Sequence, residues 1–111
     1  MTRVVRMEDT PAFASVPGLV THALVGDGAM LNVSRLEPGA VIELHSHPHE
    51  QVGYVVDGSV VLTCAGMERT LTAGDAYQIT GGDEHALRAG PEGARVVDTF
   101  DPVREDYRAA S

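Results

Sequence analysis

Apolar residues recur along this chain in short runs, and Gly, Pro and Asp-Gly interrupt them at close intervals. Between the interruptions the runs are continuous or alternate with polar residues, which is the spacing of β-strands. The segments that this pattern predicts to be strands are MLNVSRLE, AVIELH, QVGYVV, SVVLTC, RTLTA, DAYQIT, HALRA and ARVVDTF. We expect at most a turn or two of helix, around residues 10–16 and 105–110. The pattern therefore predicts an all-β sandwich or barrel.

The pair Asp57-Gly58 separates two Val-rich runs, YVV and SVV. Asp-Gly accommodates the positive φ angles of a type I′ turn, which joins neighbouring antiparallel strands. The pair therefore predicts a hairpin at this point.

The length of 111 residues suits one domain and leaves no room for a second core. We expect a single domain over 1–111, with the core at about 28–101, a strand-like N-terminal arm at 1–10 and a tail at 102–111. Exposed strand edges on a small barrel are usually paired or covered. The arm therefore predicts a homodimer formed by sheet extension.

Charge and cysteine content narrow the function classes. The 16 acidic residues outnumber the 8 basic ones and give a net charge of -8, so binding to nucleic acid or to anionic membranes is not expected. Cys64 is the single cysteine, which excludes a disulfide-stapled secreted scaffold. No signal peptide or membrane-spanning run is recognisable. These features favour a cytoplasmic protein that acts on a small molecule.

Three of the five histidines lie close together, in the segment HSHPH. Because side chains alternate along a strand, His45 and His47 point the same way. Pro48 then interrupts the strand and lets Gln51 return to the same place, while His85 supplies a further imidazole. This set predicts one divalent transition metal, since imidazole suits Zn, Cu, Fe and Ni and an oxygen ligand extends the choice to Mn. Such a site is cationic and attracts an anion.

Histidines also occur as surface residues or as hydrogen-bonded core residues, and we interpret His22 in that way. His49 has the parity of the ligands but follows Pro48, so we expect it beside the metal site or in solvent. Cys64 alternates with Val60 and Leu62 and reads as a small core residue.

The two histidine blocks resemble the paired motifs of the cupin superfamily. The matching positions are Gly39, His45, His47, Gln51 and Gly58, followed by Gly74, Thr80, Gly82 and His85. The resemblance implies a double-stranded β-helix, which is a jelly-roll-like barrel. Gln51 stands where Glu is usual and changes the charge of the metal site. Thr80 stands where Pro is usual and affects only the rigidity of a turn.

The blocks HSHPHEQVGYVVDG and VVDTFDPVREDY together resemble the small pectin-degradation cupins of the KdgF type. That family linearises 4,5-unsaturated monouronates released by pectate or alginate lyases, so the resemblance implies an anionic sugar acid as substrate. It also implies metal ligands at His45, His47, Gln51 and His85. Ligands of these types tolerate Ni, Zn, Mn, Fe or Co, so the sequence does not fix the metal. Three residues near the C-terminus complete the implied site, namely Asp98, Phe100 and Arg104.

The residue types suit that chemistry independently. Opening a cyclic hemiacetal and tautomerising the resulting enol needs a proton shuttle, a Lewis acid and a cation for the carboxylate. Asp98 would move protons, Arg104 would hold the carboxylate in bidentate fashion, and Phe100 would pack on the sugar ring. Alternatively, Asp98 is solvated or pairs with Arg95, Phe100 belongs to the core, and Arg104 forms an exposed ion pair with its neighbour, Glu105.

Two other functions remain open at this stage. One is an Fe(II) dioxygenase, because three His and a weak Gln leave coordination positions for O₂. The other is a non-catalytic module that binds a small acid, although the chain shows no attached domain through which to report binding. Tyr54 and Tyr77 either line the pocket or are ordinary buried tyrosines with satisfied hydroxyls.

Overall fold

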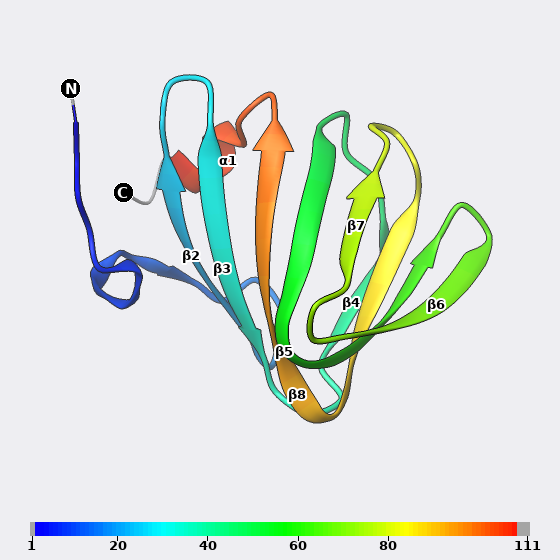
Figure 1. Cartoon of the computed structure of the whole chain (residues 1–111). Helices are drawn as coiled ribbons and strands as arrows, with labels where there is room; N and C mark the ends of the chain where they lie inside the picture. Colours follow the sequence, from blue (N-terminus) through cyan, green and yellow to red (C-terminus); the bar gives the residue numbers. More distant parts are fainter. Residues whose placement is uncertain (1, 109–111) are drawn as a thin grey trace.

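The computed structural model describes residues 2–108 and shows a barrel of two facing β-sheet layers (Figure 1). The predicted all-β fold is confirmed. In chain order the elements are the 3₁₀ helix η1 (Met7–Asp9), the strands β1 (Ala12–Phe13), β2 (Leu19–Val25), β3 (Met30–Leu36), β4 (Val41–His45), β5 (Glu50–Cys64), β6 (Met67–Thr72), β7 (Ala76–Ile79) and β8 (His85–Asp101), and the helix α1 (Glu105–Arg108).

Two long strands, β5 and β8, pair with each other along their length and take part in both layers. One layer contains β1, β2 and β3, the second half of β8, the first half of β5, and β7. The other layer contains β4, the first half of β8, the second half of β5, and β6. All of these pairings are antiparallel, and both layers face a common interior.

The hairpin predicted at Asp57-Gly58 is wrong, because β5 continues through this pair to Cys64. Gly58 does have a positive φ of 75°, but the register with β8 shifts on both sides of the pair, which is the mark of β-bulges. Gly58 also packs against Gly93 of β8, where an added Cβ would overlap the backbone. The positive φ therefore bends β5 from one layer into the other instead of reversing it.

Strand β2 lies before the expected core at 28–101 and was not predicted. It pairs with β3 from Leu19 opposite Leu36 to Val25 opposite Met30, and its alternate residues are buried. The expected helical turn at residues 10–16 is wrong, because strand β1 lies there instead. The short helix expected at 105–110 is confirmed over Glu105–Arg108, and residues 109 and 110 lie outside the described part.

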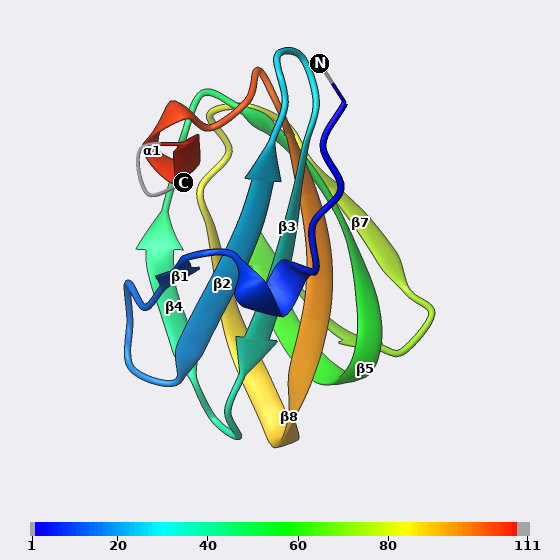
Figure 2. The same ribbon diagram turned by 90° about the vertical axis from the view of Figure 1, so that its left-hand side faces the viewer.

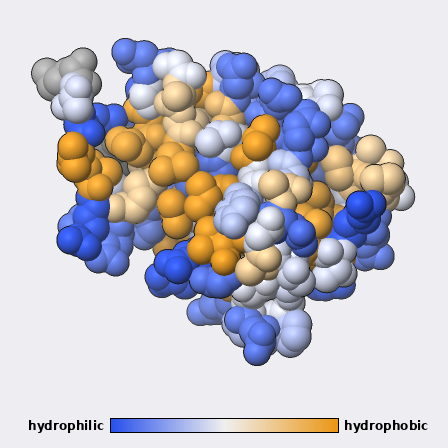
Figure 3. Space-filling model, in the orientation of Figure 1, coloured by the Kyte–Doolittle hydropathy of each residue, from blue (hydrophilic) through white to orange (hydrophobic). Residues whose placement is uncertain are grey.

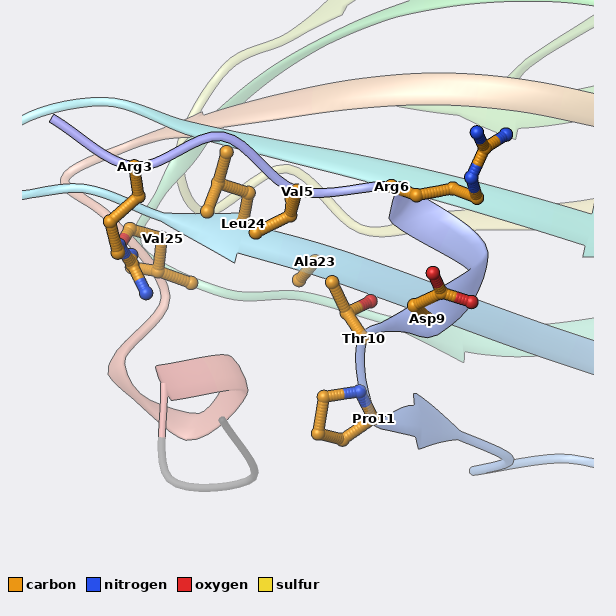
Figure 4. A pocket seen from close by; sticks show the side chains of 9 residues that line it. All are labelled: Arg3, Val5, Arg6, Asp9, Thr10, Pro11, Ala23, Leu24 and Val25. Atoms are coloured by element: carbon orange, nitrogen blue, oxygen red, sulfur yellow. The ribbon is translucent and has the colours of Figure 1, made fainter.

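The N-terminal arm is not a strand over residues 2–6. In the view of Figure 2 it passes in front of β3 before reaching η1, which contacts β2. The Arg3 guanidinium donates a hydrogen bond to the Val25 carbonyl at 2.9 Å. Arg3 and Val5 lie over Leu24 and Val25 and line a shallow cavity of about 420 Å³ (Figure 4).

The core consists of two hydrophobic clusters. The larger one lies where β5 and β8 bend, and Leu36, Val55 and Val60 within it are at most 2% exposed. The smaller one includes Met30, Phe100 and Val103, with Tyr107 of α1 packed against it. No helix within residues 2–108 is long and apolar enough to cross a membrane.

Candidate functional site

Three histidines converge at one end of the barrel interior. His45 is the last residue of β4 and lies directly opposite His85, the first residue of β8. His47 lies in the turn after β4, yet its ring faces the other two. One ligand atom from each histidine lies within 4.8 Å of the others. The three histidines are therefore positioned to bind one metal ion, as the sequence predicted.

The hydrogen bonds of the three rings fit a metal site. In each ring Nδ1 lies within hydrogen-bonding distance of a main-chain carbonyl, and because a carbonyl only accepts, a neutral ring carries its proton on Nδ1 and keeps a lone pair on Nε2. Nε2 of His85 is buried and has no hydrogen-bond partner in the described part of the chain. A buried nitrogen without a partner is costly, and a bound cation would satisfy it. The carbonyls belong to Glu43 for His45 (2.9 Å), His49 for His47 (3.0 Å) and Asp83 for His85 (2.8 Å).

The surroundings of His47 and His85 favour neutral imidazoles. Burial lowers the pKa of His47, and the nearby positive charges of Arg104 and His85 lower it further. Burial also lowers the pKa of His85, against an opposing hydrogen bond to the Asp83 carbonyl. Neutral rings are the form that binds metals.

Gln51, near the start of β5, lies between the histidines and the second half of β8. Its Oε1 lies 3.2 Å from His47 Nε2, and its Nε2 donates a hydrogen bond to Asp98 Oδ1 at 3.1 Å. With the His47 proton on Nδ1, the Gln51 and His47 atoms that face each other are both lone-pair donors. A cation between them would satisfy both, which is consistent with the predicted ligand role of Gln51.

Asp98 is 6% exposed and faces the interior from β8. Its Oδ1 also accepts a hydrogen bond of 2.5 Å from the Tyr77 hydroxyl. Burial raises the pKa of Asp98, and the hydrogen bonds from Tyr77 and Gln51 oppose that rise. The alternative in which Asp98 pairs with Arg95 is wrong, since Arg95 pairs with Asp57, 3.2 Å away.

Arg104 follows β8 and lines the same cavity between the two sheet layers as the three histidines. Its side chain is only 20% exposed, and the guanidinium carbon lies 5.2 Å from the ring centres of both Phe100 and Tyr107. The guanidinium bonds Asp106 in bidentate fashion, from Nε to Oδ1 at 3.1 Å and from Nη2 to Oδ2 at 2.9 Å. The exposed pair with Glu105 does not form, because Glu105 instead pairs with Arg108.

Phe100 takes part in both the core and the cavity wall. It is 7% exposed and belongs to the smaller hydrophobic cluster. Its ring centre also lies 5.6 Å from that of His47. Phe100 thus supports the site residues more than it offers an open face to a ligand.

The remaining sequence candidates divide between the site and the surface. Tyr77 lines the cavity, whereas Tyr54 is 48% exposed on the outer face. His49 stacks edge-on against His47, with ring centres 5.6 Å apart, but is not one of the three grouped histidines. His22 lies away from the site and bonds the Thr10 carbonyl. Cys64 is half-buried and lies outside both core clusters.

The cavity between the layers has a volume of about 600 Å³. Its wall also includes polar residues that no motif in the sequence indicated. Thr21 and Ser34 share a hydrogen bond of 2.8 Å. Asn32 is 3% exposed, and its Oδ1 has no partner among residues 2–108. The alternation in MLNVSRLE places Asn32 and Ser34 on the face of Met30 and Leu36, and this signal could have identified them.

Known proteins match both the sequence and the fold. The family described as Cupin domain matches residues 32–100. The pectin degradation protein KdgF of Dickeya dadantii is 34% identical over 82 residues, which are 73% of this chain and 74% of that protein. An RmlC-like cupin from Shewanella frigidimarina superposes with a TM-score of 0.87 at 30% identity over 96% of both chains. KdgF from Halomonas sp. gives 0.86 at 27% identity over 96% of this chain and 98% of that one.

Proposed function

This chain belongs to the cupin domain family, and on that premise we propose that it is a metal-dependent enzyme that linearises 4,5-unsaturated monouronates. Such sugars arise in the breakdown of pectin or alginate, and the similar protein from Dickeya dadantii is a pectin degradation protein. The observation that carries the proposal is the convergence of three histidines, a buried carboxylate and a guanidinium on one cavity of about 600 Å³.

His45, His47, Gln51 and His85 are the residues that would hold the metal. Three imidazoles and an amide oxygen suit Ni, Zn, Mn, Fe or Co. When bound, such an ion supplies a Lewis acid that polarises an oxygen atom of the substrate.

Asp98 would move the protons of the reaction. The anomeric hydroxyl loses a proton, the bond between the anomeric carbon and the ring oxygen breaks, and an aldehyde and an enolate form. Carbon 4 of the enolate then takes up a proton, so the overall change is an isomerisation in which no atom is gained or lost. Both hydrogen bonds to Asp98 use Oδ1, which leaves Oδ2 without a partner in the described residues. A carboxyl whose pKa is raised by burial suits reversible proton transfer.

Arg104 would bind the substrate carboxylate. Asp106 occupies its Nε and one hydrogen of Nη2, so both hydrogens of Nη1 and the second hydrogen of Nη2 remain to bind a second carboxylate in bidentate fashion. The rings of Phe100 and Tyr107 hold the guanidinium in place. Phe100 therefore acts mainly by supporting Arg104 and His47.

We also propose that the protein forms a homodimer in the cytoplasm. Exposed apolar side chains gather on the outer face of β3, β8 and β5 (Figure 3), among them Leu31, Val52 and Tyr54. A contiguous apolar patch of this kind favours association. Light scattering during gel filtration tests the dimer, and a monomeric mass would refute it.

The free thiol of Cys64 suits a reducing compartment such as the cytoplasm, and cell fractionation tests the location.

The function is tested by adding purified metal-loaded protein to 4,5-unsaturated galacturonate and guluronate. Proton NMR should show the alkene signal giving way to an open-chain keto-uronate, with loss of ultraviolet absorbance. Asp98→Asn, assayed with excess metal so that the site is filled, should lose turnover by 100-fold or more, on the order expected for a proton shuttle. Asp57→Asn makes the same chemical change on the outer face and should keep full activity.

Two results would redirect the proposal. Oxygen consumption with another substrate, together with intact uronate, would favour a dioxygenase. Tight uronate binding without chemical change would favour a binding module. Full turnover by Asp98→Asn would refute the role of Asp98.

A further inference from the structure

A glycine allows two functional side chains to meet across a strand. Strand β5 lies between β7 and β8, and its Gly53 is directly opposite Tyr77 on one side and Asp98 on the other. A Cβ atom at Gly53 would overlap both the Tyr77 ring and Asp98 Oδ1. Because this space is empty, the Tyr77 hydroxyl reaches over β5 and bonds the carboxylate.

The same carboxylate oxygen controls the Gln51 side chain. An amide has a donor end and an acceptor end, and a carboxylate only accepts. Gln51 must therefore turn its NH₂ group toward Asp98, which directs its Oε1 toward His47. The Tyr77 hydrogen bond fixes Asp98 and thus the direction of this amide.

We propose that Tyr77 and Asp98 are positioning residues that hold Gln51 Oε1 toward the metal, and that Asp98 is the reason for glutamine at position 51. A glutamate at 51 would set a second carboxylate against Asp98 at the present contact of 3.1 Å, where two like charges repel. The inference rests on the metal site of the proposed function and is independent of its substrate. It is compatible with proton transfer at Oδ2, since the positioning bonds use Oδ1.

Cobalt binding to the metal-free protein provides the first test. The affinity for Co²⁺ is measured by chelator competition in four proteins: the natural chain, Asp98→Asn, Gln51→Glu and the double variant. With Gln51 present, Asp98→Asn should weaken binding about tenfold or more, because the new amide no longer dictates the glutamine orientation. In the Gln51→Glu background, Asp98→Asn should strengthen Co²⁺ binding. The asparagine removes the repulsion between the two carboxylates, and its NH₂ group can donate a hydrogen bond to the glutamate. A purely structural role of Asp98 would weaken binding in both backgrounds and would overturn the proposal.

A pair of tyrosine variants gives the second test. Tyr77→Phe should lower Co²⁺ affinity about fivefold, as expected for one lost hydrogen bond, and should shift the Co²⁺ absorption bands. Tyr54→Phe, on the outer face of β5, should change neither quantity. Identical results for the two variants would overturn the role of Tyr77, and this comparison holds even if Asp98→Asn fails to fold.

These results are separable from the proposed function. One outcome is that Asp98→Asn weakens Co²⁺ binding beside Gln51 and strengthens it in the Gln51→Glu background, while uronate is not turned over. In that case the positioning inference stands and the proposed reaction fails. If the natural chain does not bind Co²⁺, the metal site is refuted and the inference falls with it.

Discussion

Replacing Gly53 with alanine should destabilise the protein far more than an ordinary glycine substitution. The new Cβ would enter the space in which the Tyr77 hydroxyl meets Asp98. The Tyr77 ring and the carboxylate cannot both keep their positions, because they lie on strands paired with either side of β5. The substitution therefore crowds a buried region and breaks a hydrogen bond to a buried carboxylate.

The magnitude follows from these two effects. Overpacking of a well-packed interior costs about 1–3 kcal/mol. A lost hydrogen bond to a charged group adds about 1.5–3 kcal/mol. For a chain of this length, each kcal/mol lowers the melting temperature by about 4 °C. Together the two effects cost about 2.5–6 kcal/mol, so we expect Gly53→Ala to melt roughly 10–24 °C below the natural protein.

Circular dichroism melts of the metal-free proteins measure this difference. The matched control is Gly28→Ala, since an added Cβ at Gly28 meets nothing within 4 Å and its φ is not positive. The control should melt within about 2 °C of the natural chain, as for a neutral surface change. A fall of less than about 4 °C for Gly53→Ala would refute the close packing of Tyr77 and Asp98 over β5.

Three further predictions concern the site. Arg104→Lys should raise KM for unsaturated uronate about tenfold with a smaller change in kcat, because lysine cannot bind a carboxylate in bidentate fashion. Arg95→Lys, on the outer face, should behave as the natural chain. Equal KM values for the two variants would contradict the binding of the substrate carboxylate by Arg104. His85→Ala should lower metal affinity on the order of 100-fold or more, measured by elemental analysis after gel filtration, with His22→Ala as the control that keeps its metal. Because the pKa values of His47 and His85 are lowered from 6.5 in the folded state, the unfolded chain binds more protons below about pH 6.5, and the metal-free protein should lose stability as the pH falls below that value. His47→Gln should flatten this decline in melting temperature, and parallel curves would count against the lowered pKa of His47.

The alternation of apolar residues predicted most strands because their two faces differ in polarity. Strand β2 was missed because Leu19, Thr21 and Val25 face inward while Val20 and Leu24 face outward. Both faces therefore mix polar and apolar residues, and the alternation carries no contrast. Strand β2 is defined by its hydrogen-bonded pairing with β3, which its own sequence does not indicate.

The Asp57-Gly58 pair shows a second limit of local patterns. A positive φ at glycine serves a hairpin turn and a β-bulge equally well. Only the distant strand β8, which pairs on both sides of Gly58, decides between them. The sequence therefore predicted the special backbone position but not the course of the chain.

The grouping of the candidate site residues on one cavity was predictable where they are close in sequence or match a known motif. The spacing of His45 and His47 indicated two ligands, and the resemblance to pectin-degradation cupins indicated Asp98 and Arg104. The contact between Tyr77 and Asp98 was not predictable, since it depends on the register of three strands and on Gly53 between them. That glycine looked like an ordinary member of the run QVGYVV.

Strand β8 carries both His85 and Asp98, and this constrains how the chain length can vary during evolution. Insertion of one residue within either paired segment, 85–89 or 94–98, would reverse the face of every side chain on one side of the insertion. It would also break the pairing with β5, which extends over both halves of the strand. Length variation among proteins that share this site is therefore expected in turns such as residues 26–29 or in the unpaired segment 90–93, and not within 85–89 or 94–98.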